Sequence, residues 1–146
     1  MKHILNWMIK IVTTGGFKDP VLKESFDEYK TRLSRFTRLE VLELKAKAKK
    51  GILSHLKEGD FVVALDEKGK HLSSHELSDL IRENYLSKNL VFVVGGPSGL
   101  DKDVLERADI QVSISKMTFT SQITRLLLIE QIYRAFTIIK GVEYHK

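Results

Sequence analysis

The chain has 146 residues, of which 42% are hydrophobic, so its length and apolar content predict a single folded domain and exclude a multidomain or disordered chain. A formal net charge of +5 favours a polyanionic partner such as a nucleic acid, although proteins of many other functions carry a similar excess. Cysteine is absent, which excludes disulfides and thiolate metal sites, and the lack of a bilayer-length apolar run or a secretory signal predicts a cytoplasmic protein with no membrane partner.

Apolar and polar segments alternate along the chain in a strand–helix rhythm. Because Met8 starts a better strand than Met1 does, we expect residues 1–7 to be an extension outside the fold and residues 8–146 to form the domain. The predicted elements, in chain order, are a strand at Lys10–Thr14, a helix from Pro20 to about Leu33, a strand at Leu39–Leu44, a short basic helix at Ala46–Lys57, a strand at Phe61–Leu65, a helix at about Ser74–Tyr85, a strand at Leu90–Val94, a short helix from Asp101 to Arg107, a strand at Asp109–Ser115 and a long helix at Ser121–Lys140. This alternation predicts an α/β fold with a mostly parallel sheet flanked by helices.

Helix starts and one strand carry the clearest local signals. Asp19 precedes Pro20, the pattern of an N-cap followed by proline at the first helical position. Ser73 and Glu76 have the spacing of a capping box. The Leu90–Val94 run lacks polar alternation, which indicates a strand that is buried on both faces.

The last predicted helix is apolar around most of its circumference rather than along one stripe. A single-domain core buries only one face of such a helix, so we expect a second copy of the chain to cover the remainder in a homodimer. Glu130 and Arg134 lie four residues apart on this helix and should form an ion pair that apolar neighbours partly remove from water.

A glycine-rich turn, Gly95–Gly99, follows the buried fourth strand. Its spacing matches neither the dinucleotide-binding fingerprint nor a P-loop. It is either a simple tight turn or a place where the backbone comes close to a ligand at the carboxyl end of a sheet strand.

Three other groups of residues have both a functional and a plain structural interpretation. His71 and His75 are four residues apart, but no third ligand lies nearby in the sequence and no metal is expected. The Lys45–Lys50 run is either a solvated helix face or a phosphate contact. The tail, Tyr144–Lys146, is either a frayed end or a group that stacks on and hydrogen-bonds an unpaired base.

Four blocks of sequence can be taken together: Phe92–Leu100, Ser113–Phe119, Arg125 with Glu130–Ala135, and Tyr144-His145. In order and spacing they resemble the RlmH family, small bacterial SPOUT-class methyltransferases that act on large-subunit ribosomal RNA. The resemblance covers nearly the whole chain from Met8 onward. It implies methylation of N3 of a pseudouridine in 23S rRNA by a homodimer that works on the assembled ribosome. It also implies S-adenosyl-L-methionine as cofactor and a SPOUT-type fold with a C-terminal trefoil knot.

The resemblance further implies a cofactor site and an RNA site. The implied cofactor-binding residues are Leu65, Gly96, Ser115, Lys116, Met117, Thr118, Phe119 and Thr120. The implied RNA-binding residues are Arg125, Arg134, Tyr144 and His145, and the last three are also the candidate catalytic residues.

Methylation of a ring nitrogen requires loss of its proton, which needs positioning and either a base or a field that favours the anion. His145 is either that base, because imidazole suits proton transfer near neutral pH, or it helps Tyr144 to hold the target ring by stacking. Arg125 and Arg134 are candidates for stabilising the anion or binding phosphate. In a dimer, the tail of one subunit could complete the cofactor site of the other.

Three departures from the family pattern concern the substrate more than the fold. Thr120-Ser121 stands where the family usually has Pro-His, so no role of that histidine is carried over. A Lys-Glu-Gly element is reduced to Lys49-Lys50-Gly51, and Gly16 replaces a lysine near the end of the first strand. Two alternatives therefore stay open: a SPOUT methyltransferase with another RNA target, and a non-catalytic RNA-binding protein associated with the ribosome.

Overall fold

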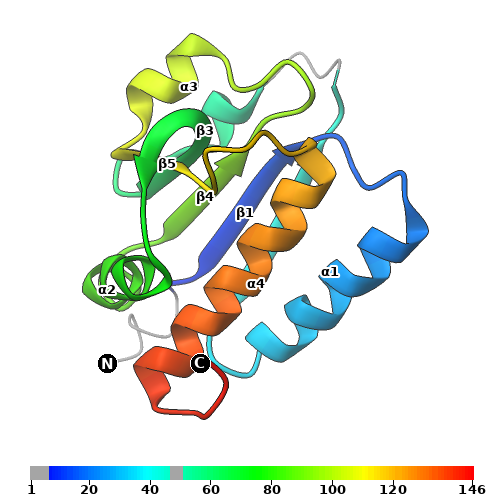
Figure 1. Ribbon diagram of the computed structural model, residues 1–146. Helices are drawn as coiled ribbons and strands as arrows, with labels where there is room; N and C mark the ends of the chain where they lie inside the picture. The colour runs from blue at the N-terminus through cyan, green and yellow to red at the C-terminus, as the bar shows by residue number, and fades with distance from the viewer. Residues whose placement is uncertain (1–6, 47–50) are drawn as a thin grey trace.

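The computed structural model describes residues 7–46 and 51–146. Five strands form one sheet in the order β2-β1-β4-β3-β5, and every pair of neighbours is parallel (Figure 1). The strands are β1 (Ile9–Thr14), β2 (Leu39–Leu44), β3 (Phe61–His71), β4 (Leu90–Val94) and β5 (Ile110–Ser113). The α/β class and the parallel sheet expected from the alternation are confirmed, and the strands end together at one edge.

Helices cover both faces of this sheet. The helical elements are α1 (Pro20–Leu33), the 3-10 helix η2 (Ile52–His55), α2 (Ser74–Asn84), α3 (Lys102–Arg107) and α4 (Ser121–Lys140). Side chains of α1, α2 and α4 form one apolar core with one face of the sheet, while η2 and α3 pack against the opposite face (Figure 1). Two apolar layers therefore enclose the central strands, as in other α/β folds.

The central strand and the helix caps follow the sequence signals closely. All five residues of β4 are buried, with Phe92 in the core under α4 and Val91 and Val93 in the core under α3. The Asp19 side chain accepts a hydrogen bond from Val21 N at the start of α1. Ser73 and Glu76 complete a reciprocal capping box at the start of α2. These local contacts explain why the predicted bounds of α1, α2, β4 and α4 agree with the structure to within a residue.

The basic helix expected at Ala46–Lys57 is wrong for the residues that the structure describes. Gly51 is extended, and only the four residues of η2 are helical, with 3-10 geometry. Leu56 is extended again and ends the turn. A single short turn suffices here because the buried Ile52 and the partly buried Leu56 anchor the segment to the core on this face of the sheet. Most of the Lys45–Lys50 run lies outside the described residues.

Strand β3 is longer than predicted, because it continues beyond Leu65 after an irregularity. Leu65 and Lys70 both pair with Val112, so the residues between them form a loop that leaves the sheet and returns to it. Gly69 lies so close to β5 that a Cβ atom there would be 2.6 Å from Val112 N. The charged residues of this loop do not resemble a strand, which is why the pattern placed the end at Leu65.

Met8 is hydrogen-bonded to the residues at the start of β4. Met8 N donates to Asn89 Oδ1 at 3.0 Å, and Leu90 N donates to Met8 O at 3.1 Å. The expected extension lies almost wholly outside the described residues and stays a prediction, as does the trefoil knot. Within residues 7–46 and 51–146, no helix has the length and apolar content that a membrane crossing requires.

Candidate functional site

A cleft of about 700 Å³ opens at the irregularity of β3 after Leu65, at the carboxyl ends of β4 and β5, and at the start of α4. It lies where parallel α/β sheets usually bind ligands. The residues implied as cofactor ligands that line it are Leu65, Gly96, Ser115, Met117, Thr118, Phe119 and Thr120. Lys116 is not among the lining residues. Three loops that are far apart in the sequence thus meet around one space.

The glycine turn after β4 forms one wall of this cleft. Gly99 N donates to Gly96 O at 2.9 Å, which closes the turn. Gly99 has φ = +81°, a conformation that favours glycine. A Cβ atom on Gly95 would lie 2.4 Å from Gly99 C, closer than real side chains approach. The turn therefore needs glycine at both positions, and it presents bare backbone to the cleft.

The loop between β5 and α4 forms the facing wall and is held by its own hydroxyl groups. Ser113 Oγ donates to Ser115 O at 2.8 Å, and Met117 N donates to Ser115 Oγ at 3.0 Å. The Thr120 hydroxyl caps α4 by accepting from Ile123 N. Met117 is 75% exposed, so an apolar side chain at the cleft is largely open to solvent.

The sequence patterns did not predict the third wall of the cleft. Asp66, Glu67 and Lys68 line the cleft from the loop that interrupts β3. Asp66 Oδ2 accepts from Lys68 N at 3.1 Å, which orders the start of the loop. The available signal was a charged segment directly after a buried strand, since ligand-binding polar groups often follow such strands. Two carboxylates and a cation are thus added to the backbone and apolar walls.

Arg125 occupies the interior rather than an RNA-binding surface. Its side chain is 2% exposed, and Nη1 and Nη2 donate to Gly15 O at 2.8 Å and to Thr14 O at 2.5 Å. The guanidinium carbon lies 5.7 Å from the centroid of the Phe17 ring. Burial lowers the pKa of Arg125, and the Glu43 carboxylate partly offsets this effect. Arg125 thus binds the end of β1 to α4, so this arrangement does not offer its guanidinium to phosphate or to a base.

We expect Arg125→Met to lower the free energy of unfolding by about 2–3 kcal/mol, because two buried carbonyl groups lose their donors. Urea titration followed by circular dichroism measures the loss. Arg82→Met is the matched control, since Arg82 pairs with Asp79 on the surface and such pairs contribute at most about 1 kcal/mol. Equal losses for the two variants would contradict the structural role of Arg125.

The residues implied as catalytic form a second cluster at the end of α4. The tail folds back on this helix after Gly141, whose φ of +68° allows the reversal. Arg134 Nη2 donates to Glu130 Oε2 at 2.7 Å, and Tyr144 Oη donates to the same oxygen at 2.7 Å. Arg134 Nη1 lies 3.1 Å from His145 Nδ1. The expected helical ion pair is therefore present, and it anchors the tail.

Aromatic rings pack around this tail cluster and remove it partly from water. The Tyr144 ring contacts Tyr133 edge-on, with centroids 4.9 Å apart, and its hydroxyl lies 3.3 Å from that of Tyr29. Burial and the hydrogen bonds to Tyr29 and Glu130 raise the pKa of Tyr144, so its phenol stays protonated. The hydrogen bond to Glu130 raises the pKa of Arg134. The cluster is thus a fixed set of donors rather than a frayed end.

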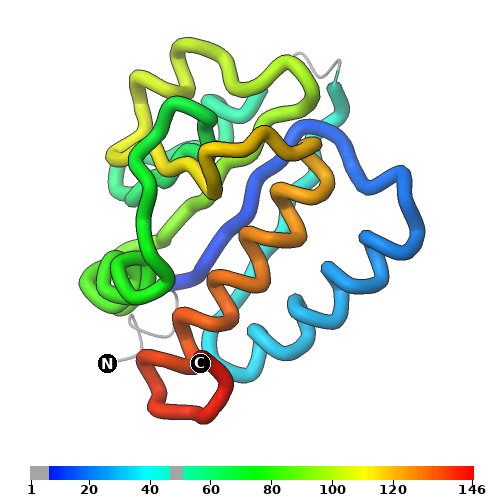
Figure 2. The backbone as a smooth tube through the Cα atoms, viewed as in Figure 1, coloured from blue at the N-terminus to red at the C-terminus, as the bar shows by residue number. Residues whose placement is uncertain are grey.

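The loop that precedes α4 and the tail that follows it lie at opposite ends of this helix (Figure 2). The cleft is lined by the first and the tail cluster is formed by the second, so the two sites are also at opposite ends of α4. The helix rises about 1.5 Å per residue, which puts Arg134 roughly 20 Å from Thr120 along the axis. One copy of the chain therefore brings together the implied cofactor residues and, separately, the implied catalytic residues. It does not join the two groups.

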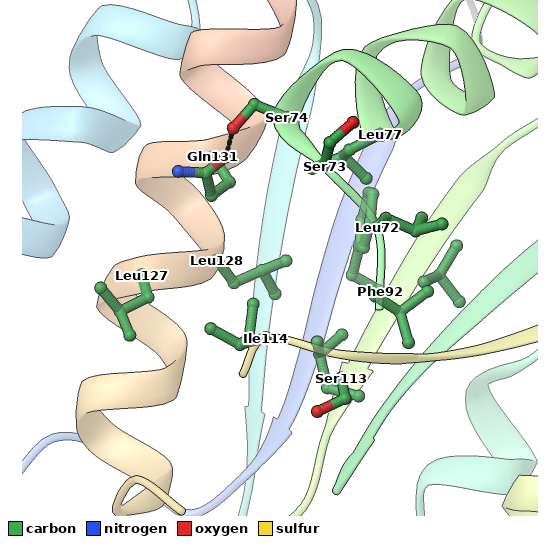
Figure 3. Close-up of a pocket in the computed structure, with 13 residues that line it drawn as sticks. Leu72, Ser73, Ser74, Leu77, Phe92, Ser113, Ile114, Leu127, Leu128 and Gln131 are labelled. Atoms are coloured by element: carbon green, nitrogen blue, oxygen red, sulfur yellow. Dashed lines mark hydrogen bonds between the residues drawn. The ribbon is translucent and has the colours of Figure 1, made fainter. Parts of the chain in front are cut away.

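A smaller pocket of about 290 Å³ lies between α2, α4 and the sheet (Figure 3). The residues that it shares with the cleft are Leu65, Val112, Ser113 and Ile114. At its other end Ser74 Oγ donates to Gln131 Oε1 at 2.6 Å, as the dashed line in Figure 3 marks. Its apolar walls come from five separate elements, β3, α2, β4, β5 and α4, so sequence patterns did not indicate it.

His75, one of the two histidines considered as a metal pair, contacts the tail of the chain. Its ring lies against that of His145, with centroids 4.8 Å apart and the planes nearly perpendicular. Among residues 7–46 and 51–146, no three histidine or acidic side chains gather where they could hold a metal ion.

Comparisons with known proteins agree on one family. A family model described as "Predicted SPOUT methyltransferase" matches residues 7–145. Ribosomal RNA large subunit methyltransferase H of Caldicellulosiruptor saccharolyticus is 43% identical over 154 aligned residues, which cover 95% of this chain and 100% of that protein. The protein of the same name from Desulfotalea psychrophila is 43% identical, with 100% of both chains covered.

Solved structures share the fold at low sequence identity. A "probable methylase family protein" from Haemophilus influenzae Rd KW20 superposes with a TM-score of 0.65 at 10% identity, over 94% of this chain and 70% of that one. A "Probable Methyltransferase" from Bordetella pertussis Tohama I gives a TM-score of 0.64 at 11% identity, over 93% of this chain and 99% of that one. The sheet and its helices are thus the arrangement found in other methyltransferases.

Proposed function

The chain belongs to the SPOUT methyltransferase family, and from that premise we propose that it methylates N3 of a pseudouridine in 23S ribosomal RNA with S-adenosyl-L-methionine as methyl donor. Full-length similarity to ribosomal RNA large subunit methyltransferase H supports an rRNA methyltransferase. An enzyme that works on ribosomes acts in the cytoplasm. The observation that carries the proposal is that nearly all the residues implied as cofactor ligands line one cleft.

The cleft fits S-adenosyl-L-methionine in size and in chemistry. Small-molecule sites measure roughly 300–1,000 Å³, and this one has about 700 Å³. Bare backbone at Gly95–Gly99 allows a flat ring to come close, and Leu65 and Met117 offer it apolar contacts. The carboxylates of Asp66 and Glu67 suit ribose hydroxyls or a positive charge. S-adenosyl-L-methionine carries no phosphate, which agrees with the lack of a phosphate-binding fingerprint in the sequence.

The cofactor supplies a methyl group on a positively charged sulfur. The protein must position N3 of the RNA base and favour the form of the base in which N3 has lost its proton. The tail cluster is suited to the second task. Arg134 carries a positive charge held by Glu130, and the hydroxyl hydrogen of Tyr144 binds the tail to the same carboxylate. A cation and donors placed beside a base favour its anion and also fix its position.

A homodimer would unite the two groups of residues. Each copy has a cleft at one end of α4 and a tail cluster at the other. A second copy packed in the reverse direction would therefore place its tail cluster beside the cleft of the first copy. Apolar side chains remain exposed near the cleft, with Ile123 at 37% and Phe119 at 38% exposure. Their burial against a second copy would contribute to association. The proposed active site is therefore composite.

Calorimetry and rRNA mass spectrometry test the proposal. We expect the purified chain to bind S-adenosyl-L-methionine and to methylate one pseudouridine in ribosomes from a strain that lacks this gene. Absence of cofactor binding at millimolar concentration would favour the non-catalytic RNA-binding alternative. Cofactor binding with methylation of a different RNA would favour the other SPOUT alternative.

A further inference from the structure

The contact between Arg134 and His145 fixes which ring nitrogen of His145 carries the proton. Arg134 Nη1 lies 3.1 Å from His145 Nδ1, within hydrogen-bond distance. A guanidinium has donors and no acceptor, so Nδ1 must be the acceptor. A neutral imidazole has one acceptor and one donor nitrogen, which leaves the hydrogen of His145 on Nε2.

Neighbouring groups hold Arg134 in the orientation that this contact needs. Its Nη2 donates to Glu130 Oε2 at 2.7 Å and its Nε to Glu130 Oε1 at 3.3 Å, so the carboxylate binds one edge of the guanidinium through two hydrogen bonds. Nη1 lies outside this edge and faces His145. The Tyr144 ring lies under the guanidinium, 4.9 Å from its carbon, and His75 contacts the imidazole edge-on. The side chains of α4, α2 and the tail thus set one tautomer.

We infer that His145 serves as a hydrogen-bond donor through Nε2 to a carbonyl oxygen of the target base, and not as the base that removes the N3 proton. Glu130 and Arg134 are the positioning residues of this donor. The inference rests on the proposed function for the identity of the substrate. The tautomer itself rests on the contacts in this chain alone.

A hydrogen-bond donor beside a carbonyl oxygen of a uracil-type ring can promote methylation at N3. When N3 loses its proton to solvent, the negative charge spreads onto the two carbonyl oxygens beside it. A donor at one of these oxygens stabilises the anion, as donors do for other developing oxyanions. The anion then forms the N3–C bond while the sulfur–methyl bond breaks, and the electron pair of that bond stays on sulfur. His145 neither gains nor loses a proton in this sequence.

A general base would need a free lone pair on the same ring. In this arrangement the Nδ1 lone pair faces Arg134, and Nε2 carries hydrogen. Proton removal by His145 would therefore require the Arg134 contact to break first. The donor role requires no change in the orientation of the ring or in its contact with Arg134.

Nitrogen-15 NMR of the full-length chain tests the tautomer without any substrate. We expect the ring of His145, assigned by comparison with His145→Gln, to have the shifts of a protonated Nε2 and an unprotonated Nδ1. In Arg134→Met this preference should weaken, because Nδ1 loses its donor. A wild-type ring protonated on Nδ1 would overturn the inference, whatever the enzyme methylates.

Two substitutions of His145 test the role in turnover. The amide nitrogen of His145→Gln can donate from about the position of Nε2 but cannot act as a base, and His145→Leu can do neither. We expect the Gln variant to keep kcat within about tenfold and the Leu variant to lose about 100-fold or more, the usual cost of an oxyanion donor. Equal loss in both variants would overturn the donor role. An inactive wild type that still has the expected tautomer would instead count against the proposed function.

Discussion

Removal of Tyr144–Lys146 is expected to lower methyl-transfer turnover by about 100-fold or more while leaving the affinity for S-adenosyl-L-methionine within about threefold. The reason is geometric, since the tail cluster lies at the far end of α4 from the cleft. Single-turnover rates on ribosomes and calorimetry with the cofactor measure the two quantities. The deletion should leave α4 intact, because Gly141 and the Val142 N to Thr137 O bond at 2.8 Å are kept.

Removal of Lys146 alone is the matched control, and it should leave turnover almost unchanged. The composite site can be examined in mixed dimers of a tail-deleted chain and a chain with a damaged cleft. One active site of such a dimer has both an intact cleft and an intact tail, so partial activity should return. No recovery in dimers shown to be mixed, or a cofactor affinity that falls as steeply as turnover, would contradict the arrangement proposed for the two ends of α4.

The second large effect is expected for Gly95→Ala in the glycine turn. The added Cβ would lie 2.4 Å from Gly99 C, so the backbone of the turn must move. We expect cofactor affinity to fall at least about tenfold, which corresponds to about 1.4 kcal/mol of lost binding free energy. Calorimetry measures this change, and thermal unfolding checks that the domain still folds.

Gly59→Ala is the matched control, because Gly59 is not among the residues that line the cleft and a Cβ atom there would meet no atom of the described residues within 4 Å. We expect affinity close to that of the wild type. If both alanine variants bind the cofactor equally well, the turn does not form part of the cofactor site.

Local chemistry made most of the fold predictable. Caps at Asp19 and Ser73 located two helices, and the unbroken apolar run at Leu90–Val94 located the central strand. Where the outcome depended on distant residues, the sequence patterns were insufficient. The return of β3 to the sheet depends on pairing with Val112, and no local signal marks such a pairing.

The candidate site shows the same difference between features with a local sequence signal and features that depend on distant residues. The resemblance of ordered motifs grouped the cleft residues, because the ends of parallel strands meet at one edge. Arg125 was expected to meet RNA, but its burial depends on carbonyl groups 110 and 111 positions away, at Gly15 and Thr14. The Glu130–Arg134 pair was expected from helical spacing, whereas its contacts with Tyr144 and His145 depend on how the chain reverses after Gly141.

The contact of Arg125 with the end of β1 has a consequence for biosynthesis. The first strand leaves the ribosome early, yet the guanidinium that satisfies its last carbonyl groups is made more than a hundred residues later. Contacts of such long sequence separation slow folding, and domains usually complete it as units. A nascent chain therefore cannot bring β1 into its final surroundings until α4 has emerged from the ribosome.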